Sequence, residues 1–290
     1  MSEPSVKYGI LVAVDGSPES DAALRWAAAE ALMRAASITL VHVIAPVVVT
    51  WPVRYLQSSY EESQEDNAKH VIERALTIVR DASGGSDLNI LTEVRHGGVV
   101  TELIHASSRA AMTVVGSRGL GAVAGSILGS VSRSLLHYGH GPVAVIRPEG
   151  HVTPTSPVLL GIDGSPASEP ATGLAFDEAS RRGVGLVALH AWSDVEMFPA
   201  LDEHWREHEQ DGQEILAERL AGWQERYPDV SVARRIVRDR PARWLLDEAS
   251  RAQLVVLGSR GRGGFSRMLL GSVSTAVAEA STTPVIVVRS

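Results

Sequence analysis

The chain alternates short, uniformly apolar runs with longer stretches whose apolar residues recur along one helical face. YGILVAV (8–14), SITLVHVI (37–44) and MTVVG (112–116) are rich in β-branched residues, which is typical of strands buried on both faces. ESDAALRWAAAEALMRA (19–35) and SYEESQEDNAKHVIERALTIVRDA (59–82) have the spacing of helices with one apolar face. This alternation predicts a parallel sheet with helices on both faces.

The alternation continues to residue 146. LTEVRHG (91–97) and GPVAVI (141–146) are predicted strands, and VVTELIHASSRA (99–110) and SVSRSLLHYG (130–139) are predicted helices. The first half of the chain is therefore expected to hold five parallel strands.

The whole pattern then repeats. GILVAVDGSPESDAALRWAAAEA (9–31) matches PVLLGIDGSPASEPATGLAFDEA (157–179), and GPVAVIRP (141–148) matches TPVIVVRS (283–290). We predict two tandem α/β units, residues 1–148 and 157–290, each an open five-stranded parallel sheet. Residues 149–156, rich in Pro and Thr, are the predicted linker.

Each unit carries the glycine motif G-x2-G-x9-G-S directly after its fourth apolar run. The motif residues are Gly116, Gly119, Gly129 and Ser130 in the first unit, and Gly258, Gly261, Gly271 and Ser272 in the second. Glycines there would let the backbone turn tightly and approach a ligand. The Gly-Ser pair opens a helix whose free N–H groups favour a phosphate, and Ser132 adds a hydroxyl donor. The alternative is that these glycines form only turns and a helix start.

Two familiar phosphate motifs are excluded. No lysine lies in either glycine stretch, so neither is a P-loop. The dinucleotide fingerprint fails because its third glycine is missing and the stretch follows a late strand.

Asp15 and Asp163 end the first predicted strand of each unit in the sequence DGSP. Asp-Gly and Ser-Pro favour turns, and Ser or Asp favours a helix cap. The same carboxylates are also placed to accept a ribose hydroxyl or to hold Mg²⁺ beside phosphates. His42 and His190 occupy equivalent places and are interpreted as structural. HWREH (204–208) has the pattern of some zinc peptidases, but we reject a zinc site there because the first unit has no counterpart.

Composition narrows the function classes. The 290 residues have a net charge of −7, and neither half is basic, which argues against nucleic acid as a partner. The absence of cysteine excludes disulfides and thiolate catalysis. No apolar run approaches about 18 residues, so no membrane span is expected. The N-terminus has no signal-peptide pattern, and a cytoplasmic location is expected.

Taken together, VAVDGSP and LGIDGSP, LVHVI and LVALHAW, and the two glycine motifs resemble the universal stress protein family, over nearly all of both units. The glycine motif resembles that of the ATP-binding branch. The resemblance implies two Rossmann-like domains. It also implies ATP, or another adenine nucleotide such as AMP or cyclic AMP, in each domain. Mg²⁺ at Asp15 and Asp163 is expected from their carboxylates and only together with the nucleotide.

The resemblance further implies specific nucleotide contacts. In the first unit they are Ala13, Asp15, Val43, Gly116, Arg118, Gly119, Gly129, Ser130, Val131 and Ser132. In the second they are Gly161, Asp163, Ala191, Gly258, Arg260, Gly261, Gly271, Ser272, Val273 and Ser274. Backbone at Val43 and Ala191 would contact adenine, the aspartates ribose or phosphate, and the glycine motifs the phosphates.

Three functions stay open at this point. The resemblance implies a nucleotide-binding regulator of stress survival or growth arrest, which is favoured because no catalytic residue or phosphate lysine is recognisable. The alternatives are a slow ATPase or other adenine-nucleotide hydrolase, and an interaction module that binds nucleotide incidentally. The apolar strands VAVI and VIVV are expected to meet, within the chain or across a homodimer.

Overall fold

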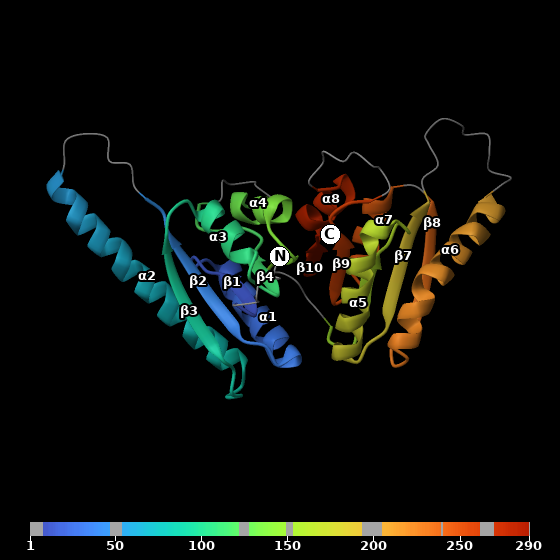
Figure 1. The fold of residues 1–290 in the computed structure, drawn as a ribbon, viewed down its shortest axis with the longest axis horizontal. Helices are drawn as coiled ribbons and strands as arrows, with labels where there is room; N and C mark the ends of the chain where they lie inside the picture. Colours follow the sequence, from blue (N-terminus) through green and yellow to red (C-terminus); the bar gives the residue numbers. More distant parts are fainter. Residues whose placement is uncertain are drawn as a thin grey trace, which may run out of the picture. The chain divides into compact units, whose positions relative to one another are not determined.

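The computed structural model describes residues 8–46, 54–121, 128–148, 153–192, 205–238, 240–261 and 270–289. They fall into two compact units, Met1–Pro148 and Glu149–Ser290. Both units combine parallel strands with helices, which confirms the predicted fold class (Figure 1).

The first unit places β1 at the centre of its sheet. Its elements are β1 (Ile10–Ala13), α1 (Pro18–Arg34), β2 (Ile38–Ile44), α2 (Arg54–Ala82), β3 (Ile90–His96), α3 (Val99–Ser107), β4 (Met112–Gly116), α4 (Ser130–Tyr138) and β5 (Pro142–Ile146). The strand order is β3-β2-β1-β4-β5, and each neighbouring pair is parallel. Ile10 pairs with Ile38 on one side and with Met112 on the other.

The second unit repeats this topology. Its elements are β6 (Val158–Gly161), η1 (Pro166–Ser168), α5 (Glu169–Arg182), β7 (Leu186–Trp192), α6 (Trp205–Arg226), β8 (Val232–Arg238), α7 (Pro241–Ala249), β9 (Leu254–Gly258), α8 (Ser272–Ala280) and β10 (Val285–Val288). The strand order within this unit is β8-β7-β6-β9-β10, also parallel.

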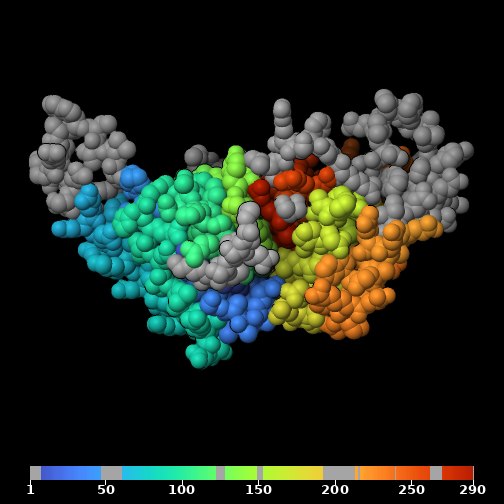
Figure 2. Space-filling view, in the orientation of Figure 1, coloured from blue at the N-terminus to red at the C-terminus, as the bar shows by residue number. Residues whose placement is uncertain are grey.

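Burial explains why the central strands are apolar throughout. Leu11 and Val12 of β1 are both fully buried, because α1 and α2 pack together on one face of the sheet and α3 and α4 on the other. Four alanines of α1 (Ala23, Ala27, Ala28 and Ala31) have no exposed surface, and their small side chains let that helix lie close to the strands. The long helices α2 and α6 form the surfaces drawn in light blue and orange in Figure 2.

A local sequence signal sets the start of α1. Ser17 caps α1 by accepting a hydrogen bond from the N–H of Ser20 at 3.1 Å, as the DGSP sequence predicts. Gly16 and Gly164 in the same turns have positive φ angles of 82° and 77°. The largest difference from the sequence prediction is α2, which begins at Arg54 rather than at residue 59.

The order in which strands are added to the sheet switches sides at β1, and this switch positions the candidate site. From β1 the connections lead to β2 and β3 on one side, and β4 and β5 lie on the other. Connections that leave neighbouring parallel strands toward opposite sides open a crevice at the carboxyl ends of those strands. In the second unit β6 lies between β7 and β9 in the same way.

Candidate functional site

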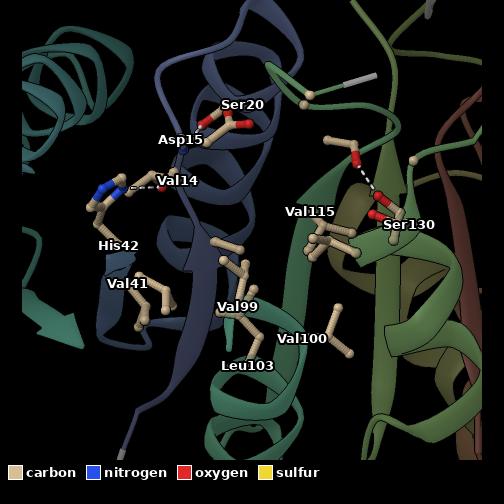
Figure 3. Close-up of a pocket in the computed structure, with 18 of the residues that line it drawn as sticks. Val14, Asp15, Ser20, Val41, His42, Val99, Val100, Leu103, Val115 and Ser130 are labelled. Carbon is tan, nitrogen blue, oxygen red and sulfur yellow. Dashed lines mark hydrogen bonds between the residues drawn. The ribbon is translucent and has the colours of Figure 1, made fainter. Parts of the chain in front are cut away.

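A cavity of about 520 Å³ lies at the carboxyl ends of β1, β2 and β4 in the first unit (Figure 3). This volume is within the range of small-molecule sites. All ten residues implied for the first unit line this cavity: Ala13, Asp15, Val43, Gly116, Arg118, Gly119, Gly129, Ser130, Val131 and Ser132. Residues from four separated segments are therefore brought together at one place.

The start of α4 forms one wall of the cavity. Gly129 is the N-cap residue and provides no side-chain cap, so the first N–H groups of the helix have no partner within the helix. The N–H of Gly129 itself donates to the carbonyl of Ser117 at 2.7 Å. The remaining amides, with the exposed Ser130, are an anion-binding arrangement.

Ser132 has a different role from the one expected. Its hydroxyl is buried and donates to the carbonyl of Gly116 at 2.6 Å, and Ser274 donates to Gly258 at 2.7 Å. This bond joins the end of β4 to the first turn of α4 (and β9 to α8). The Ser132 proton is thus used within the protein, and only Ser130 keeps an exposed hydroxyl in this turn.

Asp15 joins two parts of the site. Its Oδ1 accepts hydrogen bonds from the N–H and the hydroxyl of Ser17, at 3.0 and 2.6 Å, and its Oδ2 accepts one from the N–H of Leu120 at 3.0 Å. Asp163 accepts the same two bonds from Ser165, at 3.0 and 2.8 Å. In both units the carboxylate forms the turn. Asp15 also lines the first cavity and holds the glycine loop through Leu120.

Close packing explains two of the motif glycines. Gly116, Gly119 and Gly129 are not among the residues with positive φ, so backbone conformation does not by itself require glycine there. A Cβ at Gly116 would lie 2.7 Å from the backbone carbon of Glu19, and one at Gly119 would lie 2.4 Å from Oδ2 of Asp15. Glycine is needed at these two positions because α1 and Asp15 pack directly against them.

Arg118 lines the cavity and is already ion-paired. Its Nε lies 3.0 Å from Oε1 of Glu19, whose side chain is 12% exposed. Glu19 lies in the first turn of α1, which packs on Gly116 at the end of β4. A carboxylate therefore competes with any anionic ligand for this guanidinium.

The apolar wall of the cavity was missed by the sequence analysis. Val99, Val100 and Leu103 of α3 face Val41 and Val115 across it (Figure 3). The available signal was topological: α3 follows β3 and so begins at the same edge of the sheet.

His42 borders the cavity but has a structural bond. Its Nδ1 lies 2.8 Å from the carbonyl oxygen of Val14, and Nδ1 of His190 lies 2.8 Å from that of Ile162. These bonds join β2 to β1 and β7 to β6 at the strand ends. Each histidine therefore links two neighbouring strands, as expected for a structural residue.

The second unit repeats the framework of the site. Gly161, Asp163 and Ala191 lie at or just beyond the ends of β6 and β7, Gly258, Arg260 and Gly261 at and after the end of β9, and Gly271, Ser272, Val273 and Ser274 at the start of α8. The N–H of Gly271 donates to Ser259 at 2.7 Å, as Gly129 does to Ser117. Both units therefore make the same bond at the helix start of their glycine motif.

Parts of the predicted pattern lie outside the described residues. These are residues 122–127 and 262–269 within the glycine motifs, and the side chains of HWREH (204–208). Across the part of the chain that the structure describes, no helix is both long enough and apolar enough to cross a membrane.

The comparisons with known proteins agree on one family. A profile of the Universal stress protein family matches residues 9–147 and 155–289. A universal stress protein of Mycolicibacterium smegmatis is 58% identical over 292 positions, covering 100% of this chain and 99% of that protein. The crystal structure of a universal stress protein from Archaeoglobus fulgidus has a TM-score of 0.70 at 22% identity, covering 97% of this chain and 98% of that one. The crystal structure of a universal stress protein in complex with cAMP covers 46% of this chain and 97% of its own, at 26% identity and a TM-score of 0.36.

Proposed function

Because this chain belongs to the universal stress protein family, we propose that it binds one adenine nucleotide in each of its two units and acts as a nucleotide-dependent regulator of stress survival or growth arrest. Binding is the primary role, and hydrolysis of ATP, where it occurs, is slow.

The observation that carries the proposal is the division of the first cavity into two kinds of surface. Val99, Val100 and Leu103 give one side an apolar wall, which suits a flat base. Gly129 and Ser130 give the other side the uncapped start of α4, which suits phosphate. A nucleotide has one apolar, planar end and one anionic end, and so matches both surfaces in a single molecule.

The glycine motif fits phosphate for a steric reason as well. Side chains are absent at Gly119 and Gly129, so ligand atoms can approach the backbone amides closely. Mg²⁺ bound to nucleotide usually takes one or two carboxylates together with phosphate oxygens. Asp15 and Asp163 each supply one carboxylate, and would hold such an ion only together with the phosphates.

Calorimetric titration of the full chain with ATP tests the proposal. We expect about two nucleotides per chain, one for each helix start. Ser130→Glu and Ser272→Glu should each remove one, because a carboxylate at a helix N-terminus stabilises the helix but repels phosphate. Ser130→Gln is the matched neutral control and should keep binding. A wild-type chain that binds neither ATP nor AMP would refute the proposal.

A second measurement separates a regulator from an enzyme. The full chain is incubated with ATP and Mg²⁺, and the nucleotide recovered after denaturation is identified by mass. Intact ATP after hours supports a binding protein. Rapid conversion of ATP to ADP would instead support the alternative that the protein is a nucleotide hydrolase.

A further inference from the structure

The two sites share one framework but differ in charge at the phosphate end. In the first unit Glu19 pairs with Arg118 at 3.0 Å. In the second unit the residue that follows Ser-Pro is Ala167 instead of Glu19. The structure confirms that the two are equivalent: the backbone of Glu19 is the nearest neighbour of a Cβ built at Gly116, and the Ala167 carbonyl lies 3.5 Å from one built at Gly258.

Without that carboxylate, Arg260 has a different environment from Arg118. Arg260 is exposed and has no ion-pair or hydrogen-bond partner among the described residues, whereas Arg118 is half-buried against α1. Arg289, directly after β10, is close enough to Arg260 to respond to its charge. Burial, and then the charge of Arg260, lower the pKa of Arg289. Two guanidinium groups therefore share the carboxyl edge of β9 and β10. Arg118 and Arg147 are the equivalent residues of the first unit, so the two units differ here in the carboxylate of Glu19 and not in the number of arginines.

The first turn of α7 also carries more positive charge than the first turn of α3, its equivalent in the first unit. Gly98 and Thr101 line the first cavity at the start of α3. The helix α7 has the same nine-residue length and the same place after the third strand of its unit, and Arg240 and Arg243 occupy the matching positions. Both arginines are exposed. Two positions that line the first cavity, and the ion-pair partner of a third, are thus replaced by more positive residues at the equivalent positions of the second unit.

We propose that the two sites select different nucleotides: the second unit prefers the more highly phosphorylated one, and Glu19 lowers the preference of the first unit for extra phosphates by occupying Arg118. This inference rests on the proposed function, since it assigns the ligand class of each site. The physical reason is that each added phosphate brings negative charge, which an unpaired guanidinium attracts and a neighbouring carboxylate repels.

The test compares ATP with AMP at each site in the full chain. Ser272→Glu leaves the first site to be measured, and Ser130→Glu leaves the second. The quantity of interest is the Kd for AMP divided by the Kd for ATP, from calorimetry. We expect this ratio to be about tenfold larger at the second site.

Two reciprocal substitutions assign the difference to Glu19. Glu19→Gln, which keeps the size of the side chain and removes its charge, should raise the ratio at the first site by up to about tenfold. Ala167→Glu should lower the ratio at the second site by a similar factor, and position 167 is half-buried like position 19, so the longer side chain has room to reach solvent.

Asp21→Asn is the matched control. Asp21 lies in the same first turn of α1 but pairs with Arg74 of α2. Its substitution removes a carboxylate from the same helix end and should leave both ratios unchanged.

The possible failures are distinguishable. Equal ratios at the two sites, or ratios that do not respond to Glu19→Gln and Ala167→Glu, would overturn this inference and leave nucleotide binding intact. A wild-type chain that binds neither nucleotide would overturn the proposed function, and this inference with it.

Discussion

Gly119 and Gly121 lie in the same loop, and replacing each by alanine tests whether Asp15 fixes that loop. A Cβ at Gly119 would lie 2.4 Å from Oδ2 of Asp15, whereas one at Gly121 would meet no atom of the described residues within 4 Å. Neither glycine has a positive φ, so the backbone itself accepts alanine at both positions. The two variants make the same chemical change and differ only in the contact with Asp15.

The expected cost follows from the bonds that Asp15 would lose. Its carboxylate must retreat by about 1 Å to restore ordinary van der Waals separation, which breaks the bond from Leu120 and strains those from Ser17, now 3.0 and 2.6 Å. A hydrogen bond to a charged group contributes about 1.5–3 kcal/mol, but a half-exposed carboxylate recovers part of this from water. Alanine also restricts the unfolded chain, which stabilises by about 0.4–1 kcal/mol. We expect Gly119→Ala to lose about 1–2 kcal/mol and Gly121→Ala to gain slightly.

Hydrogen exchange of the β1 and β4 amides in the nucleotide-free chain measures the unfolding free energy of the first unit by itself. Repeating both substitutions in an Asp15→Ala chain completes the cycle. There Gly119→Ala should cost no more than Gly121→Ala, because the clashing carboxylate is gone. If Gly119→Ala is equally costly with and without Asp15, the loop is not held by this contact and the reasoning fails.

Two further predictions concern the carboxyl edge of the sheets, and a third concerns their outer strands. Asp15→Asn keeps an oxygen for Ser17, but its amide nitrogen cannot accept the hydrogen bond from Leu120. Titration with ATP should show about tenfold weaker binding, and denaturation should show a smaller loss of stability than Asp15→Ala causes. An affinity equal to that of the wild type would leave Asp15 as a turn residue alone. Gly116→Ala should destabilise the first unit by about 1–3 kcal/mol, because its Cβ would meet the Glu19 backbone at 2.7 Å. Gly258→Ala, whose nearest contact is 3.3 Å, should destabilise the second unit less. Equal losses of stability in urea unfolding would contradict this. The outer edges of β5 and β10 are expected to be covered, within the chain or by a second copy, so their outward amides should exchange slowly, and fast exchange would refute that cover.

The secondary structure and topology could be predicted from the sequence, whereas the side-chain and backbone contacts within the site could not. Apolar runs and helical spacing predicted the strands and helices of both units, because a strand that is buried on both faces is apolar at nearly every position. The parallel topology then placed the glycine motif at the carboxyl edge. The contact of Gly116 with Glu19 was not predictable, because the two residues are far apart in the sequence and meet only once α1 has packed on β4. The hydroxyl of Ser132 was misjudged for the same reason: its acceptor, Gly116, comes into reach only when the loop closes.

Two of the bonds that close each glycine loop come from residues outside its variable part. Gly129 binds Ser117 and Ser132 binds Gly116, at 2.7 and 2.6 Å, and the second unit repeats both bonds at 2.7 Å. These two bonds help to hold the loop ends together in both units, although the residues between the ends differ. LGAVAGSIL (120–128) and RGGFSRMLL (262–270) have equal length. An exchange of these nine residues between the units should therefore leave both closing bonds in place, so that the segment can be varied while the ends of the loop stay fixed.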